Sequence, residues 1–113
     1  MALGPEQIRH LEAIFTPQRV LKEPEDCWVY GYDNSKRQRQ PDAVVFPLCH
    51  EDILALVQFC NRDRVPLTVR GRGTGTTGAT VPLRHGIVAS LERMDRILEF
   101  SRDNRFITVE PGI

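Results

Sequence analysis

Half of the glycines in this chain lie in one short segment: four of the eight fall within residues 71–78. Because glycine reaches positive φ at little cost and has no Cβ, such a segment can turn successive backbone N–H groups toward one point. Converging amides form a concave anion site that suits a phosphate or pyrophosphate. Threonine hydroxyls would add donors, and two arginines would add positive charge. We therefore predict a diphosphate-binding loop, made of Arg70, Gly71, Arg72, Gly73, Thr74, Gly75, Thr76, Thr77 and Gly78.

A stretch rich in glycine and threonine can also be a mobile loop without a ligand. Its context favours the anion site. The apolar run 65–69 leads into it and the run 86–91 follows it, and both are typical of short buried strands. No Asp or Glu occurs from Arg64 to Leu91, although the chain balances 15 acidic against 15 basic residues. An acid-free window around the glycines is what an anion site needs.

Residues 73–78 satisfy the G-x-G-x-x-G fingerprint of nicotinamide dinucleotide sites. That fingerprint requires a helix directly after the loop and an acidic residue about 20 positions further on. Pro82 and Gly86 leave no room for a helix, and Glu92 follows another strand at the wrong distance. A phosphate loop of the Gly-Lys-Ser/Thr type is absent from the sequence as well. The sequence therefore excludes both of these nucleotide-binding classes.

Composition indicates one ordinary soluble domain, with 41% hydrophobic and 27% charged residues among 113. The formal net charge is zero, so no global field favours nucleic acid or a membrane surface. The three cysteines form no C-x-x-C pair, which argues against a disulfide framework and a metal site. No signal peptide or membrane span is visible. We expect a cytoplasmic location, with a peripheral position at the inner membrane through partner subunits left open.

The apolar periodicity predicts an α/β (α+β) fold. A strand–helix–strand unit over 43–69 should have parallel strands and a right-handed crossover, and a β-hairpin should follow it. We assign residues 1–40 to an N-terminal helical extension with a polar loop, and 41–113 to the lobe that carries the glycine loop. Because the chain stops just after a strand pattern, we expect it to be part of a longer polypeptide. The expected helices are 5–15, a short one from Pro17 and 51–62; the expected strands are 43–46, 65–69, 87–91, 97–100 and 106–109.

Five segments in this order resemble the FAD-linked oxidases of the vanillyl-alcohol-oxidase/PCMH superfamily, in particular the glycolate oxidase large-subunit and D-lactate dehydrogenase branch. The resemblance covers residues 28–113 almost continuously. The Arg-Gly-x-Gly-Thr-Gly-x-x-Gly pattern inside a strand–helix–strand frame is its most specific part. The segments are Tyr32-Asp33-Asn34-Ser35, residues 41–47, residues 65–75 with Gly78, residues 94–97, and Val109-Glu110-Pro111-Gly112.

This resemblance implies the first lobe of a PCMH-type FAD-binding domain, with residues 70–78 holding the FAD pyrophosphate. Pro47 would lie near the adenine end, and residues 110–112 would bring the chain back toward the flavin cleft. No histidine lies within 70–78, so the resemblance implies non-covalent FAD. The second lobe and the substrate domain, which carries the family's catalytic residues, have no counterpart here. The catalytic residues therefore stay unknown.

The implied activity is oxidation of a small 2-hydroxy acid such as glycolate or D-lactate, with a separate electron-acceptor subunit as a further partner. A different PCMH-type flavoenzyme, such as a reductase, would share this lobe. A non-enzymatic polyanion-binding module is a third reading, because Lys36, Arg37 and Arg39 form a basic run. No aromatic residues interleave with those basic residues, which counts against nucleic acid as a partner. That basic run is otherwise typical of a solvated surface loop.

Overall fold

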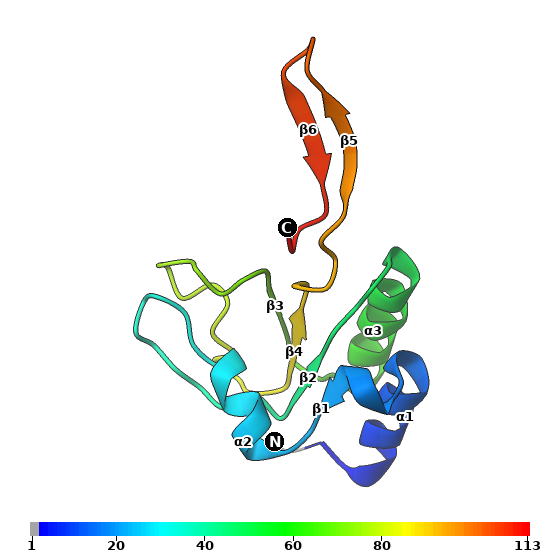
Figure 1. The fold of residues 1–113 in the computed structure, drawn as a ribbon. Helices are drawn as coiled ribbons and strands as arrows, with labels where there is room; N and C mark the ends of the chain where they lie inside the picture. Colours follow the sequence, from blue (N-terminus) through cyan, green and yellow to red (C-terminus); the bar gives the residue numbers. More distant parts are fainter. Residues whose placement is uncertain (1–2) are drawn as a thin grey trace.

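The structure is a computed structural model that describes residues 3–113; residues 1 and 2 of the expected N-terminal extension lie outside this part. An α/β lobe carries a β-hairpin that stands away from it (Figure 1). The helices are α1 (Pro5–Phe15), η1 (Pro17–Arg19), α2 (Pro24–Cys27), η2 (Trp28–Tyr30) and α3 (His50–Asp63). The strands are β1 (Val20–Leu21), β2 (Ala43–Val45), β3 (Leu67–Arg70), β4 (Ile87–Ser90), β5 (Ile97–Ser101) and β6 (Phe106–Val109).

The lobe is built on a four-stranded sheet in the order β1-β2-β4-β3. Strands β2, β4 and β3 run parallel, and β1 pairs antiparallel with β2. The predicted strand–helix–strand unit has parallel strands as expected, but β4 lies between them. All four residues of β4 are buried, which suits a central strand covered on both faces.

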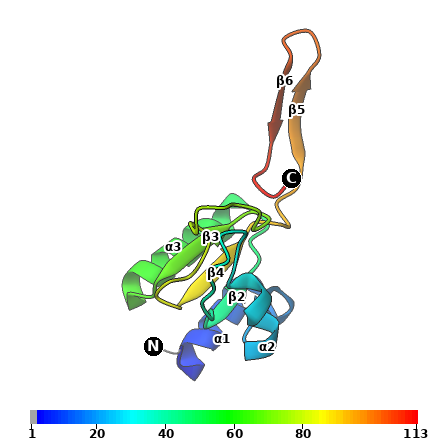
Figure 2. The ribbon, with the colours of Figure 1, turned by 90° about the vertical axis from the view of Figure 1, so that its left-hand side faces the viewer.

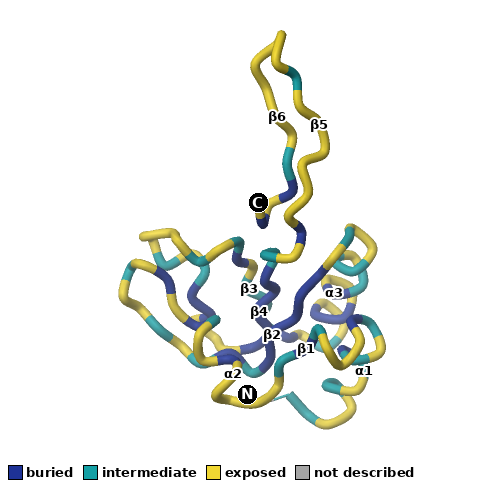
Figure 3. The backbone as a smooth tube through the Cα atoms, in the orientation of Figure 1, coloured by how far each residue is buried: buried dark blue, intermediate teal, exposed yellow. Residues whose placement is uncertain are grey.

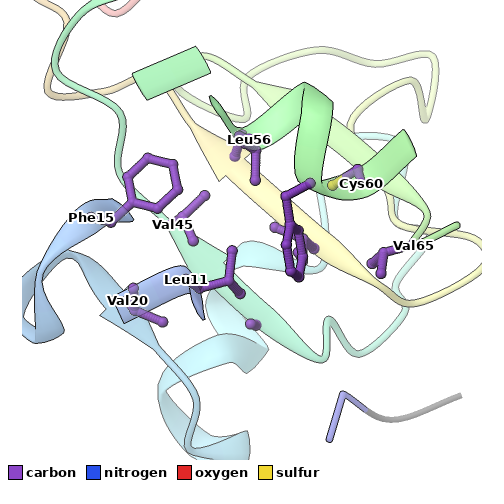
Figure 4. Packing of buried hydrophobic residues seen from close by; sticks show 11 residues of the cluster. Leu11, Phe15, Val20, Val45, Leu56, Cys60 and Val65 are labelled. Atoms are coloured by element: carbon purple, nitrogen blue, oxygen red, sulfur yellow. The ribbon is translucent and has the colours of Figure 1, made fainter. Parts of the chain in front are cut away.

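Alternation along the strands divides the core between the two faces of the sheet. On one face, Val45 and Ile87 pack with Leu11 and Phe15 of α1 and with Leu56 of α3 (Figure 4). On the other face, Val44, Phe46, Val88 and Cys27 form a second cluster. Both long helices predicted from the apolar periodicity are confirmed, and the buried residues of α3 are Leu56, Phe59 and Cys60.

The polar composition of residues 24–41 predicts irregular structure, but the first part of this segment is helical. Residues 24–30 form α2 and then η2. Pro24 occupies the first turn of α2 and Glu25 and Asp26 follow it, a combination that suits a helix start. Cys27 then anchors this short helix in the second core cluster.

The predicted hairpin is confirmed, and almost none of it is buried against the rest of the described chain. Strand β5 pairs antiparallel with β6, with Phe100 opposite Ile107. Figures 1 and 2 show the hairpin projecting from the lobe in two perpendicular views. It is exposed along nearly its whole length, as Figure 3 shows in yellow, and Phe100 is 69% exposed. The projection gives the molecule its long dimension, with extents of 52 × 32 × 23 Å.

Candidate functional site

The glycine loop leaves the sheet where the parallel strands end. It follows β3 directly, and residues 71–86 contain neither helix nor strand. The exclusion of a nicotinamide-type loop, which must open a helix, is therefore confirmed. The chain after β4 starts at the same edge, because the Leu91 amide donates to the Arg70 carbonyl over 2.8 Å. In α/β folds with parallel strands, ligands bind outside these carboxyl ends.

Seven consecutive amides in this loop have no acceptor within residues 3–113. They are the backbone N–H groups of residues 71–77. The next amide, that of Gly78, donates to Asp33 Oδ2 over 3.0 Å. Backbone donors that the chain leaves unpaired must bond to water or to a ligand. The loop therefore presents a continuous row of donors to whatever lies outside it.

The glycines of the loop differ in whether the surrounding structure requires glycine at their positions. Gly73 has φ +72° and Gly78 has φ +81°, so both adopt a backbone conformation that side chains disfavour. A Cβ at Gly73 would also overlap the Arg70 guanidinium. At Gly75 the nearest atom to such a Cβ would be Asp33 Oδ2 at 4.0 Å, an ordinary van der Waals contact, so the protein has room for a Cβ there. The backbone conformation thus explains why residues 73 and 78 are glycine, but the protein gives no such reason for Gly75.

Both predicted arginines are engaged with backbone carbonyls. Arg70 is only 7% exposed; its Nη1 donates to the Tyr32 carbonyl over 3.0 Å, and its guanidinium lies 5.4 Å from the centre of the Tyr30 ring. Arg72 Nε donates to the Gly112 carbonyl over 2.9 Å. These contacts hold Arg70 and Arg72, at the start of the glycine loop, against other parts of the chain. Contact between either arginine and an anion stays a prediction.

A second loop, residues 32–37, lies against the glycine loop, and Figure 1 shows the two side by side. The Asn34 amide donates to the Gly75 carbonyl over 2.9 Å, and Asn34 Nδ2 donates to the Thr74 carbonyl over 3.1 Å. Arg37 Cδ lies 3.6 Å from where a Cβ of Gly78 would be. The basic run that looked like a solvated loop therefore borders the glycine loop.

Asp33 is the residue of this site that sequence reasoning passed over. Its side chain is buried, and Oδ1 accepts the Ser35 amide over 2.8 Å. Hydrogen bonds from the Ser35 hydroxyl and amide, with a further one from the Gly78 amide, lower the pKa of Asp33. An Asp two residues before a Ser is a turn signal, so the local turn could have been predicted. The contact with Gly78, 45 positions away, could not.

The C-terminal segment, residues 110–112, lies beside the start of the glycine loop. Glu110 is 6% exposed and accepts hydrogen bonds from Arg96 Nε at 3.0 Å and Nη2 at 3.2 Å. These bonds lower the pKa of Glu110. The chain then returns to the glycine loop, where a Cβ at Gly71 would lie 3.3 Å from the Pro111 carbonyl oxygen. Pro47 lies two residues after the end of β2, at the same edge, but its side chain is fully buried, so its contact with a nucleotide stays a prediction.

A family described as an FAD binding domain matches residues 41–113, well over half of the chain. The chain belongs to this family, and FAD is its cofactor. The unpaired amides at residues 71–77 are compatible with the diphosphate of FAD, because free backbone N–H groups are donors that an anion of this kind accepts.

Curated relatives support the predicted branch. The chain is 38% identical over 86 residues to glycolate oxidase subunit GlcD of Bacillus subtilis, an alignment that covers 75% of this chain and 18% of the relative. It is 33% identical over 110 residues to D-2-hydroxyglutarate dehydrogenase of Stutzerimonas stutzeri, covering 96% and 24%. The resemblance to glycolate oxidases and their relatives is confirmed. The chain spans about a fifth of the length of these proteins.

Solved structures confirm the fold. An alkyldihydroxyacetonephosphate synthase superposes with a TM-score of 0.84 at 24% identity, covering 98% of this chain and 25% of the other. p-Cresol methylhydroxylase with substrate bound gives a TM-score of 0.83 at 22% identity, covering 96% and 22%. The chain therefore shares the fold of the matching part of these two proteins.

Two other kinds of site, a membrane-spanning helix and a metal site, have no counterpart in the described residues. No helix within residues 3–113 is long and apolar enough to cross a membrane. In the same residues, no group of three or more His, Cys, Asp or Glu side chains could hold a metal ion. His50 is the first residue of α3, and His85 is a turn residue whose Nδ1 lies 2.8 Å from the Gln40 carbonyl oxygen.

Proposed function

We propose that this chain is the part of a flavin-dependent oxidoreductase that holds the FAD diphosphate in the glycine loop. The observation that carries the proposal is the row of seven unpaired amides at residues 71–77, together with Gly75, where the protein has room for a Cβ. A glycine that no protein atom requires is best explained by a ligand that approaches the backbone closely. The oxidation of a small 2-hydroxy acid such as glycolate or D-lactate is the activity that we propose for the whole protein. The names of its relatives support this choice.

In this function FAD supplies the redox chemistry by accepting a hydride from the substrate carbon. The residues of this chain bind and orient the cofactor. The loop amides hold the diphosphate, the buried Arg70 and the bond from Arg72 to Gly112 keep the loop start in place, and residues 32–35 support its far side. We assign no catalytic residue to residues 1–113. With no histidine in 70–78, we propose that FAD is held without a covalent bond.

The magnitude of these contacts argues that the lobe does not act alone. Hydrogen bonds to a charged group contribute about 1.5–3 kcal/mol each. Association costs on the order of 4–15 kcal/mol in lost freedom. Three or four diphosphate contacts would barely offset that cost. We therefore propose that a second lobe, which the longer relatives have room for, grips the rest of the flavin.

Gly75→Ala tests the proposed function, because the added methyl group would make only an ordinary van der Waals contact within the protein and Gly75 has no positive φ. In the natural polypeptide that carries this chain, we expect FAD affinity to fall at least tenfold while the melting temperature stays within about 2 °C of wild type. FAD affinity is measured by flavin fluorescence. The matched control is Gly4→Ala, where a Cβ would also have its nearest neighbour at 3.9 Å, far from the loop. Unchanged FAD affinity in Gly75→Ala would refute the proposed diphosphate site.

A further inference from the structure

The Asp33 carboxylate joins two loops that lie far apart in the sequence. It is 4% exposed and belongs to the loop 32–37. Its two oxygens are used separately: Oδ1 accepts the Ser35 amide at 2.8 Å, and Oδ2 accepts the Gly78 amide at 3.0 Å. One oxygen therefore shapes its own turn, and the other holds the far end of the glycine loop.

The same turn also grips the middle of the glycine loop, but only through carbonyl oxygens. Asn34 donates from its amide to the Gly75 carbonyl and from its side chain to the Thr74 carbonyl. Bonds to carbonyls leave the N–H groups of these residues free. In this arrangement Asn34 supports the loop through the carbonyl oxygens of the loop. The backbone N–H groups of residues 71–77 have no acceptor in the described chain.

The Gly78 amide is the point where the row of free donors stops. Gly78 has φ +81°, a conformation with many alternatives for glycine in a free loop. A buried carboxylate that accepts its N–H selects one of them, because hydrogen bonds to a charged acceptor are stronger than neutral ones. The carboxylate thus fixes the direction from which the chain enters Gly78.

We propose that Asp33 is a positioning residue of the cofactor site, which holds the glycine loop in the shape that leaves amides 71–77 open to the FAD diphosphate. It acts through Gly78 and touches no part of the cofactor. The inference rests on the proposed function of the glycine loop.

The chain contains a matched control. Asp42 Oδ2 accepts the amide of Gly86 over 2.9 Å, and Gly86 also has a positive φ, +74°. This pair has the same chemistry as Asp33 and Gly78. It lies just before β2 and β4, at the opposite edge of the sheet from the glycine loop. Removing either carboxylate removes a bond to the amide of a glycine with positive φ, but only one of the two bonds supports the site.

The experiment compares Asp33→Ala, Asp33→Asn and Asp42→Ala in the natural polypeptide that carries this chain. FAD dissociation constants are measured by flavin fluorescence, and melting temperatures are measured without FAD. We expect Asp33→Ala to weaken FAD binding at least tenfold and Asp42→Ala less than twofold, with similar losses of melting temperature. Asp33→Asn keeps one acceptor oxygen for its two donors, so it should fall between wild type and Asp33→Ala.

The outcomes separate this inference from the proposed function. Equal FAD affinities in Asp33→Asn, Asp42→Ala and wild type would overturn the positioning role, even where Asp33→Ala does not fold. Equal weakening of FAD binding by the Asp33 and Asp42 variants would also overturn it, since general destabilisation would then explain both. If Gly75→Ala weakens FAD binding while the Asp33 variants do not, only this inference fails. If wild type binds no FAD, the proposed function itself fails.

Discussion

The lobe and the hairpin of this chain bury their apolar residues to opposite degrees. In the lobe, two clusters cover both faces of the sheet, and the strands β2 and β4 are wholly buried. In the hairpin, Phe100, Phe106 and Ile107 lie exposed at the surface. Isolated two-stranded hairpins are marginal in water, and exposed apolar patches mark surfaces that bind something. The difference shows that the lobe carries its own core, whereas the hairpin presents apolar side chains that residues 3–113 do not bury.

The largest effect should come from the lobe core. Leu56 of α3 is 1% exposed and packs against the sheet. Leu56→Ala removes three carbon atoms and leaves a cavity, which costs about 2–5 kcal/mol in buried leucines. We expect that loss in the free energy of unfolding, measured by urea denaturation of the chain. A loss below about 1 kcal/mol would contradict the view that the lobe depends on this core.

The next largest effect concerns the affinity of this chain alone for FAD. Residues 1–113 alone should bind FAD weakly or undetectably, since the diphosphate contacts of the lobe barely offset the cost of association. Titration calorimetry of this chain with FAD measures the affinity directly. Micromolar or tighter binding would show that the lobe needs no further polypeptide to hold the cofactor.

A smaller effect is expected at the base of the hairpin. Hydrogen bonds from Arg96 lower the pKa of Glu110 from its ordinary value of 4.5. A lowered folded-state pKa adds stability above the ordinary value, and this stability is lost as pH falls through the folded-state value. The Arg96 amide, which donates to Glu110 Oε1 over 2.9 Å, should therefore exchange faster below pH 4.5. Amide hydrogen exchange followed by NMR checks this.

Glu110→Gln is the control for that pH dependence. The variant keeps an acceptor oxygen but has no charge to titrate, so the exchange rate of the Arg96 amide, corrected for intrinsic chemistry, should no longer change specifically below pH 4.5. An identical pH profile in wild type and variant would show that another group controls the hairpin base.

The smallest effect should come from the hairpin surface. Phe100 is 69% exposed, so Phe100→Ser should change the free energy of unfolding of this chain by no more than about 0.5 kcal/mol. Urea denaturation measures it alongside Leu56→Ala. In a longer natural polypeptide that covers the hairpin, the same substitution should cost more. A loss above about 1 kcal/mol in residues 1–113 would mean that the hairpin already packs within this chain.

The sequence was informative wherever local patterns decide structure. Periodicity predicted α1, α3 and the hairpin, and the glycine cluster predicted a loop at the end of β3. Three features depended on long-range contacts and could not be predicted. Strand β1 has only two residues, too few for a pattern. The insertion of β4 between β2 and β3 is a choice of strand order.

The third feature is the support of the glycine loop by residues 32–37. Asp33 and Gly78 are 45 positions apart, and no local signal joins them. The basic run beside Asp33 has the composition of a surface loop, and only its place in the fold brings Arg37 to Gly78. Propensity describes neighbours in sequence, whereas this part of the site is made by neighbours in space.

A crystal structure of the natural polypeptide with bound FAD tests the diphosphate site most directly. We expect at least three of the backbone nitrogens of residues 71–77 to lie about 2.7–3.2 Å from diphosphate oxygens. We also expect Asp33 still bound to the Gly78 amide. A diphosphate bound elsewhere, with those seven amides facing only water, would contradict the central claim.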